Sequence, residues 1–173
     1  MRILGLAGWS GSGKTTLVTR LLPILTSFGL KVSTIKHAHH RFDVDQPGKD
    51  SWRHREAGAT EVMISSEKRW ALMHEHRGAA EPTLDQLIPH MTPVDLLLVE
   101  GFKHGLYPKL EVHRPSLAKP LLCREDSHIV AVASDAPVSG VAVPLLPLDD
   151  VAAIADFIVK HCRFEAARHG AAQ

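Results

Sequence analysis

Eight residues near the amino terminus have the types and spacing of a phosphate-binding loop. Residues Gly8 to Thr15 read GWSGSGKT and match the P-loop pattern G-x-x-x-x-G-K-[ST]. The glycines allow successive backbone N–H groups to point into one concavity around phosphate groups, and the positive end of the following helix dipole adds to the attraction. Lys14 is then expected to reach the β- and γ-phosphates, and the Thr15 hydroxyl to coordinate Mg²⁺. The spacing therefore predicts a site for a nucleoside triphosphate with magnesium.

A second candidate group is Glu100, which directly follows the apolar run Leu96 to Val99. A run that is apolar throughout is typical of a strand buried on both faces of a parallel sheet. An acidic residue at the carboxyl end of such a strand occupies the position of a Walker B carboxylate and can hold magnesium directly or through water. We therefore expect Lys14 and Glu100 to be the catalytic residues. An ordinary strand-end carboxylate is the alternative for Glu100.

The segment from His37 to Lys49 carries histidines and aspartates without periodicity and is predicted to be a long loop. Long loops in compact domains are often functional. One use is a switch that depends on the nucleotide, in which Asp43 or Asp50 approaches magnesium. Lys36 or Arg41 would approach a phosphate in the same switch. Asp43 is the metal candidate of this loop, and a solvated polar loop is the alternative.

Asp135 follows the apolar run Ile129 to Ala133, which is also predicted to be a buried strand. A carboxylate at such a strand end can accept hydrogen bonds from the N1–H and 2-amino groups of guanine. The chain lacks the complete N-K-x-D pattern of guanine recognition. Asp135 is therefore the candidate for reading the base, and a simple turn aspartate is the alternative.

The elements that must position these residues alternate between strand and helix. The strands expected from apolar runs are Ile3–Ala7, Val32–Ile35, Thr60–Ser65, Arg69–Glu75, Val94–Val99, Lys109–His113, Ile129–Ala133 and Val141–Leu145. The expected helices are Lys14–Ser27, Asp50–Gly58, Thr83–Met91 and Asp149–Cys162. The third and fourth strands are expected to form a hairpin on the sheet. This order predicts an α/β, three-layer P-loop NTPase fold with a mostly parallel sheet and a small antiparallel extension.

In sheets of this kind, ligands bind beyond the carboxyl ends of the strands. The residues at such ends are Gly8, Lys36, Glu100 and Ser134. We therefore expect four points that are distant in the sequence to converge on one site.

Length and composition fit a globular protein of one domain. The chain has 173 residues, of which 45% are hydrophobic and 23% are charged, and its formal net charge is +1. We expect a nucleotide-binding domain over residues 1–162 and a flexible tail over residues 163–173. The near-neutral charge gives no indication of nucleic acid or of a membrane surface as a partner. Two cysteines outside any C-x-x-C pattern, with no signal peptide or long apolar segment, predict a cytoplasmic protein.

Four segments resemble the MobB family of molybdopterin-guanine dinucleotide biosynthesis adaptor proteins. The segments are GWSGSGKTTL near the start, TIKHAHHRFDVDQPGKDSWRHREAGA after the second expected strand, DLLLVEGFKHGLYPKLEV around the acidic strand and VASDAP near the end. The resemblance spans Met1 to about Phe157. The P-loop alone identifies only a superfamily, whereas the HRFDVDQPGKDSWR and VEGFK segments are far more specific.

The resemblance implies a GTP-binding homodimer with weak intrinsic hydrolysis. It also implies two kinds of partner, which are the molybdenum cofactor guanylyltransferase that attaches GMP to molybdopterin and the molybdoenzymes that receive the cofactor. Carried over to this sequence, the nucleotide-binding residues are Gly11, Ser12, Gly13, Lys14, Thr15 and Thr16. Mg²⁺ accompanies GTP, and Glu100 belongs to the magnesium site together with Thr15.

A small P-loop metabolite kinase is the main alternative function. A kinase needs an acceptor pocket and cationic lid residues that close over the transferring phosphate. The cations available for such a lid are Arg41, Lys49, Arg53 and Arg55. A scaffold whose P-loop holds only a resident phosphate has less support, because the chain carries residues for both a triphosphate and a metal.

Overall fold

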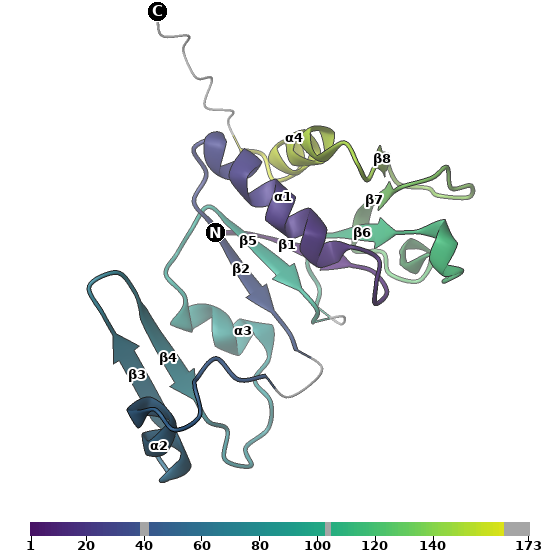
Figure 1. The fold of residues 1–173 in the computed structure, drawn as a ribbon. Helices are drawn as coiled ribbons and strands as arrows, with labels where there is room; N and C mark the ends of the chain where they lie inside the picture. The colour runs from purple at the N-terminus through teal and green to yellow at the C-terminus, as the bar shows by residue number, and fades with distance from the viewer. Residues whose placement is uncertain (39–41, 103–104, 165–173) are drawn as a thin grey trace, which may run out of the picture. The chain divides into compact units, whose positions relative to one another are not determined.

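The structure of the protein is a computed structural model, which describes residues 1–38, 42–102 and 105–164 (Figure 1). The chain forms two compact units, one made of Met1–His37 with Thr92–Gln173 and the other of Ala38–Met91. The first unit contains the P-loop, and the second contains most of the long loop predicted after the second strand. Within the described ranges, no helix is long and apolar enough to cross a membrane.

The first unit is built on a six-stranded sheet whose strand order is β2-β5-β1-β6-β7-β8. Its strands are β1 (Arg2–Ala7), β2 (Val32–Lys36), β5 (Leu96–Glu100), β6 (Lys109–His113), β7 (Ile129–Ser134) and β8 (Leu145–Pro147). All of the pairings between neighbouring strands are parallel. The α/β class predicted from the alternation of strands and helices is therefore confirmed.

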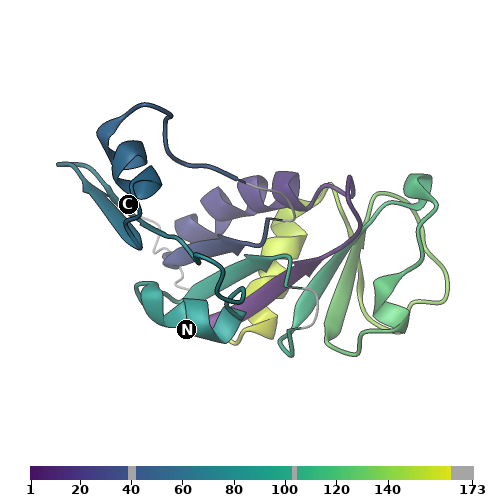
Figure 2. The same ribbon diagram turned by 90° about the horizontal axis from the view of Figure 1, so that it is seen from below.

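Two helices cover one face of this sheet and lie side by side (Figures 1 and 2). They are α1 (Lys14–Ser27) and α4 (Val151–His161). Leu17, Leu21 and Leu25 repeat at every fourth position of α1, so they share one face of the helix and are buried there. Ile154 and Ile158 of α4 belong to the same core cluster. This packing fixes α1 on the sheet, with its amino-terminal end joined to the P-loop.

The connection from β6 to β7 covers part of the other face. It contains the short 3-10 helices η2 (Pro115–Leu117) and η3 (Leu122–Arg124). Leu121 packs with Val132 of β7 in a second, smaller core cluster. Val132 alternates along the strand with Ala131 and Ala133, which belong to the core beneath α1 and α4, so the two clusters lie on opposite faces.

The second unit holds a separate, two-stranded antiparallel sheet. Its elements are α2 (Asp50–Glu56), β3 (Glu61–Ser65), β4 (Trp70–His74), α3 (Leu84–Leu87) and η1 (Ile88–His90). The predicted antiparallel hairpin is confirmed, but its expected place on the main sheet is wrong, because in the described chain β3 and β4 pair only with each other. A two-stranded hairpin needs further packing to be stable, and α2 supplies it against β3.

The last strand also differs from the sequence prediction. A strand over Val141–Leu145 is wrong for most of its length, because β8 begins only at Leu145. Pro144 precedes β8, and a proline offers no N–H to a strand ladder. Val141 and Val143 pack instead against the small core cluster of the β6–β7 connection. Their apolar character therefore reflects core packing and not strand formation.

We predict that Leu25→Ala lowers the free energy of unfolding by about 2–5 kcal/mol. The physical reason is the cavity that the truncation leaves, since Leu25 is fully buried in the core shared by α1 and α4. Urea unfolding followed by circular dichroism measures the change. Leu106→Ala is the matched control, because Leu106 is 83% exposed and its truncation removes little packing. Equal losses in the two variants would contradict the assigned core.

Candidate nucleotide-binding site

The P-loop leads from the end of β1 directly into α1. Gly13 is the N-cap of α1 and has a φ of 100°, in the left-handed region that favours glycine. Gly8 approaches β6 so closely that a Cβ there would lie 2.5 Å from the carbonyl oxygen of Val112. The other predicted nucleotide-binding residues at this junction are Gly11, Ser12, Lys14, Thr15 and Thr16. The loop therefore places backbone N–H groups and the amino-terminal end of a helix at one point of the sheet edge.

The side chain of Lys14 folds over the loop to which it belongs. Its Nζ donates hydrogen bonds to the carbonyl oxygens of Gly8, at 2.8 Å, and of Trp9, at 3.0 Å. Phosphate oxygens are stronger acceptors than these neutral carbonyl oxygens, because a hydrogen bond between two charged groups is stronger. The ammonium group is thus placed where it can exchange carbonyl contacts for phosphate contacts.

Thr15, Glu100 and Lys36 form a polar cluster beside the P-loop. Thr15 Oγ1 lies 3.1 Å from each carboxylate oxygen of Glu100. Lys36 Nζ lies 3.4 Å from Glu100 Oε1 and 3.4 Å from Thr15 Oγ1. The strand register produces this convergence, because Lys36 at the end of β2 lies opposite Glu100 at the end of β5. Hydroxyl and carboxylate oxygens are ligands that Mg²⁺ prefers, so the two predicted magnesium residues of this unit fit that ion.

Arg114 is a residue of the site that sequence reasoning misses. Its Nε donates a hydrogen bond to the carbonyl oxygen of Ser12 at 3.0 Å, and its NH1 forms an ion pair with Asp135. The predicted base reader, Asp135, is therefore engaged with a cation at the P-loop. One signal could have found Arg114, which directly follows the predicted strand Lys109–His113. Glu100 is identified as a candidate by the same criterion, because it directly follows the apolar run Leu96 to Val99.

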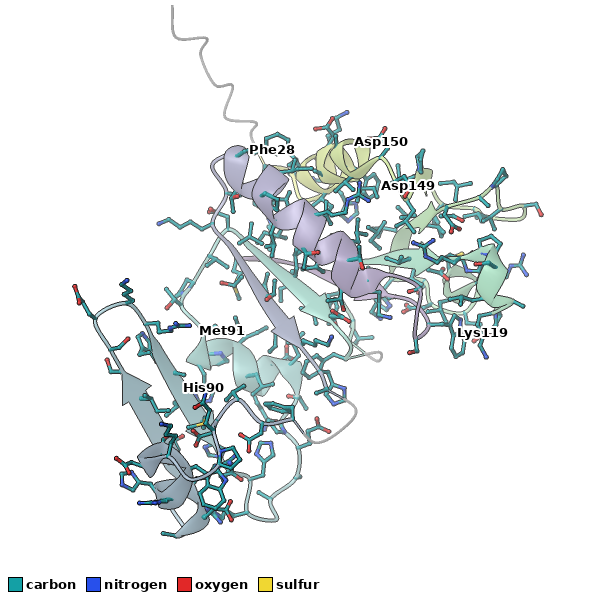
Figure 3. All side chains as sticks on the ribbon, viewed as in Figure 1. Phe28, His90, Met91, Lys119, Asp149 and Asp150 are labelled. Atoms are coloured by element: carbon teal, nitrogen blue, oxygen red, sulfur yellow. The ribbon has the colours of Figure 1, made fainter. Side chains whose placement is uncertain are left out.

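The side chain of Trp9, in the P-loop, is also held by the β6–β7 connection. Trp9 Nε1 donates a hydrogen bond to the carbonyl oxygen of Pro120 at 2.9 Å. Lys119, which is labelled in Figure 3, places its Nζ 5.6 Å from the centroid of the Trp9 ring, within the range of a cation–π contact. Residues 114–123 thus contact the P-loop at both Trp9 and Ser12, and we call this segment the brace.

A buried carboxylate anchors the far end of the brace. Glu111 of β6 is fully buried, and its two carboxylate oxygens accept hydrogen bonds from the backbone N–H groups of Leu122, at 2.8 Å, and Cys123, at 2.9 Å. His113 Nδ1 lies 3.8 Å from Glu111 Oε1. Burial raises the pKa of the Cys123 thiol, and the charge of Glu111 raises it further, so this thiol stays protonated near neutral pH. The two backbone donors compensate the burial of the carboxylate.

The acidic residues of the long loop belong to the second unit. Asp43 accepts hydrogen bonds from NH1 and NH2 of Arg55 at 3.1 and 2.7 Å, and this contact holds the pKa of Asp43 below its usual value. Arg55, a predicted lid cation, also lies 3.6 Å from Glu75 and is therefore engaged within its own unit. Asp50 begins α2, and Arg41 lies outside the described residues. A magnesium role for Asp43 stays a prediction.

Comparison with protein families gives a match to the model for MobB, molybdopterin guanine dinucleotide synthesis protein B, over residues 3–135. Two relatives are each named molybdopterin-guanine dinucleotide biosynthesis adapter protein. The relative from Escherichia coli (strain K12) is 44% identical over 161 residues, which cover 91% of each chain. The relative from Haemophilus influenzae is 44% identical over 159 residues, which cover 90% of this chain and 86% of the relative.

Solved structures have the same fold. A crystal structure of molybdopterin-guanine biosynthesis protein B (mobB) matches with a TM-score of 0.72 at 32% identity, and the match covers 93% of this chain and 99% of that chain. The crystal structure of Bacillus subtilis MobB matches with a TM-score of 0.73 at 24% identity, and the match covers 95% and 100% of the two chains. At the lower identity, the likeness shows the fold alone.

We predict that Glu111→Gln lowers the free energy of unfolding by about 1–3 kcal/mol. The substitution replaces a carboxylate oxygen with an NH₂ group, which would face a backbone N–H of Leu122 or Cys123 and leave that donor unsatisfied. Urea unfolding measures the loss. Glu125→Gln is the control, because Glu125 is an exposed residue of the same connection and should change by less than about 0.5 kcal/mol. Two variants of equal stability would contradict the anchoring role of Glu111.

Proposed function

The chain belongs to the MobB family of molybdopterin guanine dinucleotide synthesis proteins, and we propose that it binds GTP with Mg²⁺ and acts as an adaptor in the biosynthesis of molybdopterin guanine dinucleotide. The observation that carries the nucleotide part is the contact of Thr15 with Glu100 next to Lys14 in the P-loop. The adaptor part is supported by the two relatives, which are named adapter proteins of this biosynthesis.

The triphosphate would be held by three kinds of group. Backbone N–H groups from Gly11 to Thr16 would surround the phosphates, and the ammonium group of Lys14 would neutralise part of their charge. The Thr15 hydroxyl and the Glu100 carboxylate would hold Mg²⁺, which would neutralise part of the phosphate charge when it is bound. Lys36, whose Nζ lies 3.4 Å from Glu100 Oε1 and 3.4 Å from Thr15 Oγ1, would add positive charge beside the P-loop.

Slow hydrolysis is part of this proposal. Fast GTP hydrolysis uses an arginine that reaches the transferring phosphoryl group, and such an arginine finger raises the rate by roughly 10³ to 10⁵. Arg114 lies beside the P-loop, but its guanidinium is already engaged by the Ser12 carbonyl and by Asp135. The site therefore supports binding better than turnover, which suits a protein whose nucleotide-bound form is recognised by another protein.

Asp135 supports guanine as the preferred base. Its ion pair with Arg114 engages Oδ2, and among the described residues no donor is hydrogen-bonded to Oδ1. Guanine offers two adjacent donors, N1–H and the 2-amino group, to a carboxylate, whereas adenine presents an acceptor at N1. A carboxylate at the end of β7 would therefore favour GTP over ATP.

The proposed partners follow from the family and not from a surface of the molecule. They are the guanylyltransferase that joins GMP to molybdopterin and the molybdoenzymes that receive the finished cofactor. The protein would bind these partners in the cytoplasm, and it would do so as a homodimer. Membership in the family and the adapter name of the relatives support these partners. The formal net charge of +1 gives no reason to propose nucleic acid as a further partner.

We predict that Lys14→Ala abolishes measurable binding of GTP with Mg²⁺ while the protein stays folded, because the ammonium group supplies positive charge at the phosphates. Isothermal titration calorimetry with GTP and with ATP measures the affinities. Lys31→Ala is the matched control, because Lys31 is an exposed lysine beyond the carboxyl end of α1 and should leave the affinity unchanged. Undiminished affinity in a folded Lys14→Ala protein would refute the nucleotide site, and equal affinity of the wild type for GTP and ATP would remove guanine from the proposal.

We predict that Glu100→Gln weakens magnesium-dependent GTP binding and hydrolysis more than metal-free GTP binding. The variant keeps the size of the side chain but removes a negative charge beside Thr15, where the cation would lie. Affinity and GTP turnover are measured across a magnesium titration, first with the protein alone and then with the guanylyltransferase. Glu67→Gln, at an exposed position between β3 and β4, is the control. Identical magnesium curves for Glu100→Gln and the control would exclude Glu100 from the metal site, and fast turnover by the isolated wild type would count against an adaptor.

A further inference from the structure

Arg114 joins the P-loop to the end of a neighbouring strand. Its Nε contacts the Ser12 carbonyl oxygen at 3.0 Å, and its NH1 pairs with Asp135. The strand register explains the pair, because His113 at the end of β6 lies opposite Ser134 at the end of β7, and the next residues are Arg114 and Asp135. The guanidinium fork therefore holds acceptors from two different segments at once.

The contact with Ser12 orients the backbone that would bind phosphate. The Ser12 carbonyl and the Gly13 N–H belong to one planar trans peptide, so they point in opposite directions. When Arg114 holds the carbonyl on one side, the Gly13 N–H is turned to the other side, away from the guanidinium. N–H groups at this point of a P-loop bind phosphate oxygens. A cation behind the peptide thus directs a donor toward the anion site.

The peptide between Ser12 and Gly13 has few other means of being held. Gly13 has no side chain, and its φ of 100° is a conformation that glycine adopts without strain but does not enforce. Ser12 Oγ is buried and makes no hydrogen bond to a described residue, so the serine side chain does not fix the peptide either. A Cβ at Gly13 would lie 3.5 Å from NH2 of Arg114, which shows how closely the guanidinium approaches.

Asp135 keeps the guanidinium in place. The side chains of Arg114 and Asp135 are 35% and 24% exposed, so the pair is partly shielded from solvent. A bidentate or forked arginine contact of this kind is more specific in geometry than a contact of lysine, whose ammonium group is a point charge. Without the carboxylate, the guanidinium would be free to turn toward solvent and release the Ser12 carbonyl.

We propose that Arg114 is a positioning residue of the nucleotide site and that Asp135 anchors it, so that the ion pair presets the Ser12–Gly13 peptide for phosphate binding. The part of this proposal that concerns phosphate binding rests on the proposed function, whereas the ordering of the Ser12–Gly13 peptide by Arg114 does not. It follows that Asp135 affects the binding of any polyphosphate, including one without a base. Its role is then wider than the reading of guanine.

The first test needs no ligand. Backbone order parameters of Gly11 and Gly13 are measured by NMR relaxation in the wild type, in Arg114→Gln and in Asp135→Asn. We expect both amides to fall from an ordered value of about 0.85 to below about 0.6 in the two variants. Arg124→Gln is the matched control, because it removes the same charge from an exposed arginine directly after the brace and should leave these order parameters unchanged. Urea unfolding checks that every variant is folded.

The second test uses inorganic tripolyphosphate, which has the phosphate charge but no base, beside GTP. Arg114→Gln and Asp135→Asn should each weaken the binding of both ligands by on the order of tenfold. Arg114→Lys should not restore the affinity, because lysine cannot contact the Ser12 carbonyl and Asp135 in the same geometry. Asp135→Asn should add little when Arg114→Gln is already present, since the two residues act as one unit.

Two results would overturn the proposal. One is unchanged order of Gly11 and Gly13 in folded Arg114→Gln and Asp135→Asn proteins. The other is an Asp135→Asn protein that loses affinity for GTP but not for tripolyphosphate, because Asp135 would then contact only the base. A wild type that binds neither ligand would instead refute the proposed nucleotide function, and the order parameters would still decide whether the Arg114–Asp135 pair holds the loop.

Discussion

The candidate site depends on one constraint, which is the conformation of the P-loop. The loop would present backbone N–H groups to a ligand, and it uses glycines to do so. Glycines permit the required backbone conformation but do not fix it. Gly8, Gly11 and Gly13 all have positive φ angles, of 145°, 81° and 100°. Glycine accepts these angles without strain, but it also gives the free chain the greatest conformational freedom. The loop must therefore be held from outside. Strand β1 and helix α1 fix its two ends, and the brace contacts its middle.

The cations around the loop differ in what a phosphate would have to displace. Lys14 donates hydrogen bonds to two neutral carbonyl oxygens, and exchanging these two contacts for phosphate oxygens would add a charge–charge interaction. Arg114 is held by the carboxylate of Asp135, so leaving it for a phosphate would only exchange one anion for another. The first cation is therefore suited to bind the ligand, and the second is suited to stay in place and support the loop. Only the surplus of the new interactions with the ligand over the interactions that it displaces appears as affinity.

Local patterns in the sequence predict most of the elements but not their partners. The bounds of α1 and β6 agree with the prediction, because periodicity and apolar runs are properties of neighbouring residues. The hairpin of β3 and β4 has the same local pattern whether or not it joins the main sheet. Val141 and Val143, before Pro144, give the same apolar pattern whether they form a strand or pack into a core. The contacts of Thr15 with Glu100 follow from the rule that strand ends converge. The pairing of Arg114 with Asp135 depends on β6 lying next to β7, and no local pattern encodes that neighbour.

The position of Asp135 has a consequence for how this site would distinguish nucleotides. Base and phosphates of a bound nucleotide are normally recognised by separate groups, so their contributions to affinity are close to independent. Here the carboxylate that is predicted to read the base, Asp135, forms an ion pair with Arg114, which contacts the backbone of the P-loop at Ser12. A guanine that draws Asp135 toward itself would alter the support of the Ser12–Gly13 peptide, and a phosphate that fixes this peptide would in turn hold Arg114 and Asp135. Coupling between two sites is reciprocal, so the chain would bind base and triphosphate as one recognition unit.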